Sequence, residues 1–158
     1  MKMKRYLSKS IEETQKIGEE LAKEIDKFFT NKNALLIGLE GELGGGKTTF
    51  VQGFAKGLGI KERILSPTFI ILKKFKIRKK SKFKNFYHID CYRLSNYKDL
   101  LSLGFQEILN NKENIIAIEW PEKVKEILPS NYLFLKFDFI DFEKRRIIFG
   151  EKRNPPPL

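Results

Sequence analysis

The chain has 158 residues, 41% of them hydrophobic, and carries 31 basic against 20 acidic residues for a formal net charge of +11. This length suits one domain with a real core, and no apolar run approaches the roughly 20 residues of a membrane span. Cys91 is the only cysteine, which excludes an intrachain disulfide and favours a reducing cytoplasm. The excess charge either attracts a polyanion such as RNA or reflects a lysine-rich composition.

The first predicted helix begins at Ser10 and ends near Phe29. Ser10 and Glu13 have the spacing of a capping box, in which each side chain bonds an unpaired backbone N–H of the first turn. Apolar residues recur at helical intervals and predict a face packed on the core. They are Ile11, Ile17, Leu21, Ile25 and Phe28.

Residues 41–48 read Gly-Glu-Leu-Gly-Gly-Gly-Lys-Thr and fit the phosphate-loop pattern G-x-x-x-x-G-K-[ST]. An apolar strand over 34–39 leads into them, and a helix ending near residues 57–59 follows. Glycines let successive backbone N–H groups turn toward an anion, and the helix N-terminus adds partial positive charge. Lys47 can reach the β- and γ-phosphates, and the Thr48 hydroxyl can bind magnesium. The candidate nucleotide-binding residues are Glu42, Leu43, Gly44, Gly45, Gly46, Lys47, Thr48 and Thr49.

Ser66, Pro67 and Thr68 precede a predicted strand over 69–72. Thr68 is either a turn residue or a side chain at the mouth of the strand that can approach a terminal phosphate. A basic segment without acids then runs from Lys73 to Lys84, with alternating apolar residues that predict a strand entering a hairpin. The segment either protects a sheet edge or contacts RNA, and the charged edge is the preferred interpretation.

Residues 86–90 predict a strand that pairs back on the preceding one, with His88 and Asp90 on one face. Asp90 at the strand end can orient a water molecule or a magnesium-bound water, or it can be structural. His88 is the only histidine, which excludes a multi-histidine metal site. Residues 96–111 predict two short helices broken at Gly104.

Residues 114–119 are apolar until Glu119 and resemble a Walker B strand, whose terminal acid binds magnesium. Pro121 suits the first turn of a helix over 122–128, and Trp120 is either core or a wall near the nucleotide. Strands over 132–140 and 145–149 predict a hairpin. We therefore expect an α/β P-loop NTPase fold over residues 1–150, with a central, mainly parallel sheet, an antiparallel hairpin and helices on both faces. Residues 151–158 are expected to form a disordered tail.

Taken together, these motifs resemble those of the TsaE (formerly YjeE) family, the bacterial ATPase of tRNA threonylcarbamoyladenosine (t6A) synthesis. The resemblance covers roughly residues 5–150 and depends on the phosphate loop with the motifs S-P-T-F, H-x-D-x-Y-R and E-W-P-E. It implies ATP and Mg²⁺ as cofactors, with Thr48 and Glu119 holding magnesium. It also implies that Lys47 binds phosphate, that Asp90 serves hydrolysis and that Thr68 belongs to a switch-like segment.

As partners the resemblance implies the TsaB–TsaD heterodimer, which this ATPase binds and resets between turnovers. tRNA is then reached indirectly, with direct contact open to the basic segment, which is longer and more basic than is common in the family. Gly45 also departs from the usual alanine. Two alternatives remain: a small-molecule or nucleoside kinase on the same fold, and an RNA-binding module with a vestigial nucleotide site. Arginines do not cluster in a lid-like helix before Glu119, which argues against the kinase.

Overall fold

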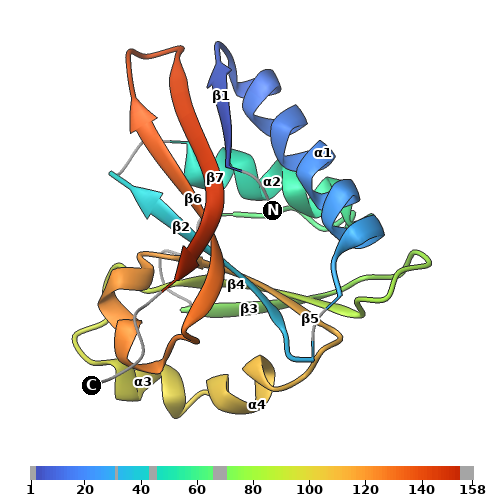
Figure 1. Ribbon diagram of the computed structural model, residues 1–158, viewed down its shortest axis with the longest axis vertical. Coiled ribbons are helices and arrows are strands. Elements are labelled where there is room, and N and C mark those ends of the chain that lie inside the picture. The colour runs from blue at the N-terminus through green and yellow to red at the C-terminus, as the bar shows by residue number, and fades with distance from the viewer. Residues whose placement is uncertain (1–2, 31, 43–45, 66–70, 154–158) are drawn as a thin grey trace.

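A computed structural model describes residues 3–30, 32–42, 46–65 and 71–153. Within these ranges seven strands form one sheet in the order β1-β7-β6-β2-β5-β4-β3, shown in Figure 1. The strands are β1 (Lys4–Ser8), β2 (Leu35–Gly41), β3 (Leu72–Lys76), β4 (Asn85–Asp90), β5 (Asn114–Glu119), β6 (Asn131–Phe139) and β7 (Arg145–Arg153).

The centre of the sheet is parallel. Strands β6, β2, β5 and β4 run in one direction, while β3 on one side and the β7–β1 pair on the other run antiparallel to their neighbours. All six residues of β5 are buried, as expected for a parallel strand covered on both faces. The predicted mainly parallel centre and the β6–β7 hairpin are confirmed.

Helices cover both faces of the sheet, also as predicted (Figure 1). α1 (Ile11–Phe28) and α2 (Lys47–Gly57) share one core with that face of the sheet. The opposite face carries α3 (Tyr97–Leu101), α4 (Phe105–Leu109) and the 3₁₀ helix η1 (Pro121–Ile127). Gly104 separates α3 from α4 with φ of 85°, which confirms the predicted break.

α1 and α2 pack with their backbones in close approach. A Cβ atom on Gly53 of α2 would lie 1.9 Å from the carbonyl oxygen of Gln15 in α1, and one on Gly18 would lie 2.5 Å from the carbonyl oxygen of Phe50. Only glycine fits at these two contacts. They fix α2, and with it the end of the phosphate loop, against α1.

The start of α1 follows the predicted capping box. Ser10 Oγ accepts a hydrogen bond from the Glu13 N–H at 3.0 Å, while the Glu13 carboxylate accepts from the N–H of Lys9. The predicted apolar face is wrong at its two ends, because Ile11 and Phe28 are exposed. Both lie beyond the stretch of α1 that packs against α2.

Several boundaries differ from those predicted. β1 was not predicted, because its sequence Lys-Arg-Tyr-Leu-Ser is short and largely polar; it is stabilised by antiparallel pairing with β7. The strand expected over 69–72 begins at Leu72 and continues into the basic segment, while residues 66–70, Thr68 included, lie outside the described residues. β7 continues through Arg153, past the expected start of the tail, and the rest of the tail is likewise outside the description. Among the described residues, no helix is both long and apolar enough to cross a membrane.

Candidate nucleotide site

The phosphate-loop sequence connects the end of β2 to the start of α2. Gly41 and Gly46 have φ of 136° and 97°, values that L side chains rarely adopt. Gly46 is the N-cap of α2 and offers no side chain to bond the first N–H groups of that helix. These donors are therefore available to an anion. Leu43, Gly44 and Gly45 lie outside the described residues, and Glu42 is exposed.

Lys47 begins α2 with its side chain almost fully buried, at 5% exposure. Its ammonium donates a hydrogen bond to the carbonyl oxygen of Gly41 at 2.7 Å and lies 4.0 Å from the centre of the Trp120 ring. Burial lowers the pKa of Lys47, and the charges of Glu119 and Asp90 oppose that shift. The side chain thus places a desolvated cation directly beside the start of α2.

Two carboxylates end the neighbouring strands β4 and β5. Asp90 pairs with Glu119 in parallel register, so both side chains leave the sheet on the same face. This is the α2 face, because Ala117 and Phe86, which precede them at even spacing, belong to the core shared with α1 and α2. The structure therefore brings Lys47, Asp90 and Glu119 together, as the sequence predicted.

Glu119 is held by a partner that the sequence did not identify. Nε2 of His88 lies 2.6 Å from Oε2 of Glu119, with exposures of 1% and 4% for the two residues. An ionised carboxylate only accepts hydrogen bonds, so the imidazole is the donor. His88 was predicted to share a face with Asp90, but its partner follows from the β4–β5 register, which sequence spacing does not contain.

Asp90 is only half-buried. Its Oδ1 accepts a hydrogen bond from the N–H of Tyr92 at 2.9 Å, which closes a turn after β4. Burial raises the pKa of Asp90, the Tyr92 N–H opposes the shift, and Glu119 adds to it. This is the environment of a carboxylate with greater than usual affinity for a proton.

Trp120 forms a wall of the site. It adopts a left-handed conformation, with φ of 60°, and its ring lies 5.1 Å from that of Tyr92. The conformation turns the chain sharply after Glu119 and sends Pro121 into η1, which is a 3₁₀ helix and not the predicted α-helix. Trp120 packs against the core of the α3–α4 face, as the first interpretation expected, and its ring also lies against the Lys47 ammonium.

The donor set fits a magnesium ion that is bound together with a nucleotide. Thr48 begins α2 beside Lys47, and the Glu119 carboxylate lies on the same face. The described residues contain no cluster of three or more His, Cys, Asp or Glu side chains able to hold a metal. Mg²⁺ is commonly held by one or two protein oxygens together with phosphates and water, so a site of this composition needs the nucleotide to be complete.

A family profile described as "Threonylcarbamoyl adenosine biosynthesis protein TsaE" matches residues 8–148. The chain belongs to the TsaE family. It is 36% identical over 150 residues to the TsaE protein of Rickettsia conorii, covering 92% of this chain and 78% of that protein. It is 33% identical over 126 residues to the protein of Haemophilus influenzae, covering 80% and 76%.

The solved structure of YdiB from Bacillus subtilis is similar throughout. It superposes with a TM-score of 0.71 at 29% identity, covering 94% of this chain and 84% of YdiB. This likeness confirms the P-loop fold predicted for the chain. TsaE relatives are named for tRNA threonylcarbamoyladenosine biosynthesis, which agrees with the resemblance noted in the sequence.

In this TsaE-family chain a cavity of about 460 Å³ opens beside the start of α2. It is lined by Thr14 of α1 and its N-cap Ser10, by Gly46 and Thr49, and by Arg145 at the start of β7. Nε of Arg145 is buried without a hydrogen-bond partner, and the guanidinium lies 4.8 Å from the centre of the Phe139 ring. Sequence reasoning named only Thr49 and Gly46 here, because the other residues come from distant segments.

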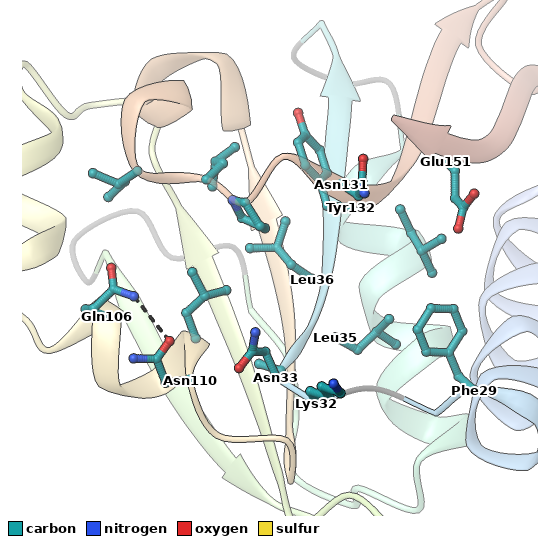
Figure 2. Close-up of a pocket in the computed structure, with 16 residues that line it drawn as sticks. Phe29, Lys32, Asn33, Leu35, Leu36, Gln106, Asn110, Asn131, Tyr132 and Glu151 are labelled. Atoms are coloured by element: carbon teal, nitrogen blue, oxygen red, sulfur yellow. Dashed lines mark hydrogen bonds between the residues drawn. The ribbon is translucent and has the colours of Figure 1, made fainter. Parts of the chain in front are cut away.

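A larger cavity lies elsewhere. It has a volume of about 660 Å³ and is lined by the first residues of β2 and β6, at the opposite edge of the sheet from Lys47. Figure 2 shows Leu35, Leu36 and Tyr132 around it, with Gln106 bonded to Asn110 on its rim. Ligands of parallel α/β sheets bind at the carboxyl ends of the strands, so the smaller cavity beside α2 is the better candidate for a nucleotide.

Proposed function

We propose that this chain is a Mg²⁺-dependent ATPase that supports t6A modification of tRNA by binding and resetting a TsaB–TsaD complex in the cytoplasm. The observation that carries the proposal is the convergence of Lys47, Asp90 and Glu119 at the N-terminus of α2. A lysine that can neutralise phosphate and two carboxylates with distinct environments are the groups that phosphoryl transfer to water requires.

Binding uses groups that are already in place. The free N–H groups at the start of α2 receive the phosphates, and the Lys47 ammonium exchanges the Gly41 carbonyl for phosphate oxygens. The cavity beside Thr49 and Arg145 receives the nucleoside. Thr48 and Glu119 hold Mg²⁺, which supplies charge neutralisation to the terminal phosphates.

Asp90 is the group proposed to orient the attacking water. One of its oxygens is committed to the Tyr92 N–H, which fixes the carboxylate plane and leaves the other for water. The raised pKa of Asp90 improves its capacity to accept a proton as the water attacks. Glu119 is unsuited to this role, because His88 already bonds one of its oxygens and Mg²⁺, when bound, would take the other. Thr68 is proposed as a switch residue that approaches the terminal phosphate.

The test measures ADP and phosphate release by the purified protein, alone and with TsaB and TsaD. Turnover should be slow alone and faster with the partners, and Lys47→Ala should abolish both. Lys56→Ala is the matched control, since Lys56 is an exposed lysine in the last turn of the same helix and pairs only with Glu19, at 3.7 Å, among the described residues. Equal turnover with and without partners would refute partner activation. Recovery of a phosphorylated small product in place of free phosphate would favour the kinase.

A further inference from the structure

The basic segment between Lys73 and Lys84 holds most of the excess charge of the protein. It contains eight of the 31 basic residues and no acid, which leaves 23 basic against 20 acidic residues in the rest of the chain. Seven of the eight are exposed: Lys73, Lys74, Lys76, Arg78, Lys80, Lys82 and Lys84. Among the described residues none of these seven forms an ion pair. The charge is therefore concentrated and uncompensated.

Edge protection explains only part of this charge. β3 is the last strand of the sheet, and its lysines guard the unpaired edge. Five of the cations lie after Lys76, where β3 ends, and so cannot protect that strand. In Figure 1 the connection from β3 to β4, in yellow-green, projects beyond the sheet on the right. This connection, residues 77–84, is named the basic hairpin tip.

The basic hairpin tip is anchored to the body of the protein. Asp26 of α1 accepts a hydrogen bond from the Ser81 hydroxyl at 2.5 Å and lies 3.5 Å from the Lys79 ammonium. The same ammonium donates to the carbonyl oxygen of Gly57 at the end of α2, at 2.9 Å. Lys79 thus anchors the tip, while the other basic side chains of the tip extend into solvent from a backbone that is held in place. A charged surface ordered in advance binds at a lower entropic cost.

The aromatic residues of the segment do not take part in this surface. Phe75 and Phe83 are 4% and 2% exposed and belong, with Ile77, to the core under α1 and α2. They cannot stack on bases, as the sequence had left open, and cannot insert into a membrane. Nor does the tip offer the apolar centre typical of a protein–protein interface. What it exposes is cationic charge alone, which suits the phosphates of a nucleic acid backbone.

We propose that the basic hairpin tip and the adjoining Lys76 at the end of β3 form a binding surface for the phosphate backbone of structured RNA, read by charge and shape and not by base sequence. This surface is separate from the nucleotide site. β4 begins at Asn85 beside the tip and ends five residues later at Asp90, so the two lie about 17 Å apart along the strand. RNA binding is therefore independent of ATP and does not depend on the proposed hydrolysis.

The test is fluorescence anisotropy of a labelled tRNA transcript and of a labelled RNA hairpin of unrelated sequence, titrated with the full chain over a range of salt. Both RNAs should bind with similar affinity, with or without ATP. The test variant replaces four exposed tip and edge cations with glutamine: Lys76, Arg78, Lys80 and Lys82. The matched control removes four exposed lysines from other surfaces: Lys16, Lys23, Lys56 and Lys125.

The test variant should weaken RNA binding at least about tenfold, and its slope of log affinity against log salt should fall by roughly 0.7–0.9 for each lost phosphate contact. The control variant should change both much less, and ATP hydrolysis should be the same in all three proteins. Equal losses of affinity in the two variants would overturn the proposal and attribute RNA binding to net charge. Displacement of the RNA by polyglutamate at equal charge concentration would overturn it in favour of an acidic protein ligand. If the fourfold variant does not give the wild-type circular dichroism spectrum, the double variant Lys80→Gln/Lys82→Gln replaces it. Its RNA affinity and its salt slope are then compared with those of the wild type in the same way.

Discussion

Replacing His88 with leucine should destabilise the protein mainly through what it does to Glu119. The substitution removes a hydrogen-bond donor that lies 2.6 Å from the Glu119 carboxylate, with both side chains buried. Both side chains are almost fully shielded from water, so the substitution leaves a buried carboxylate oxygen without its hydrogen-bond donor. Leucine occupies a volume close to that of histidine, which keeps the cavity contribution small.

The size of the effect follows from the burial of the pair. Removing the partner of a buried carboxylate costs about 3–5 kcal/mol, because the carboxylate is left uncompensated. If Glu119 is first changed to glutamine, the acceptor is neutral, and leaving it unsatisfied costs about 1–3 kcal/mol. We therefore expect His88→Leu to cost about 2 kcal/mol less in the Glu119→Gln background than in the wild type.

Urea unfolding followed by circular dichroism gives the four free energies of this double-mutant cycle. Packing changes caused by leucine itself occur in both backgrounds and cancel. If His88→Leu costs the same in both, within about 0.5 kcal/mol, the contact does not hold Glu119 and its proposed positioning role is wrong.

Three further predictions concern stability and the nucleotide. Asp90→Asn should raise the melting temperature near neutral pH, because a folded-state pKa above the unfolded value means that ionised Asp90 costs stability; the gain should fade as pH drops through the folded pKa of Asp90. Gly53→Ala should lower stability by about 1–3 kcal/mol, because its Cβ would lie 1.9 Å from the Gln15 carbonyl oxygen, and helix propensity returns at most about 1 kcal/mol. ATP should change the fluorescence of Trp120, the only tryptophan, because the Lys47 ammonium 4.0 Å from its ring moves to phosphate.

Each of these has a clear contrary result. A melting temperature of Asp90→Asn that is unchanged near neutral pH would remove the argument for a raised pKa. Wild-type stability in Gly53→Ala would mean that α1 and α2 are not in backbone contact. Unchanged fluorescence of Trp120 at an ATP concentration that saturates hydrolysis would place the phosphates away from Lys47.

Features with a local physical cause could be predicted from the sequence. The capping box at Ser10 fixed the start of α1, and Gly104 marked the break between α3 and α4 because a left-handed residue there favours glycine. The loop ending at Lys47 and the apolar run ending at Glu119 predicted both halves of the candidate nucleotide site. Parallel strands end at one edge, so even their proximity followed once the fold class was assigned.

Features that depend on strand register or on distant segments could not be predicted. The His88–Glu119 contact requires knowing that β4 and β5 are neighbours and how they are aligned. Arg145 reaches the start of α2 from a strand almost 100 residues later in the chain. β1 has little strand signal of its own and exists through its pairing with β7. In each case the stabilising partner is absent from the local sequence.

The position of β4 explains why one small protein can carry both proposed surfaces. The strand begins beside the basic hairpin tip and ends at Asp90, which lies beside Glu119. Between them, four consecutive residues are buried between β3 and β5. An RNA backbone at one edge therefore meets no atom of the nucleotide site at the other, and the cations that attract RNA do not compete with Lys47 for ATP. Because the two proposed sites lie at opposite ends of β4, we expect ATP and RNA to bind at the same time.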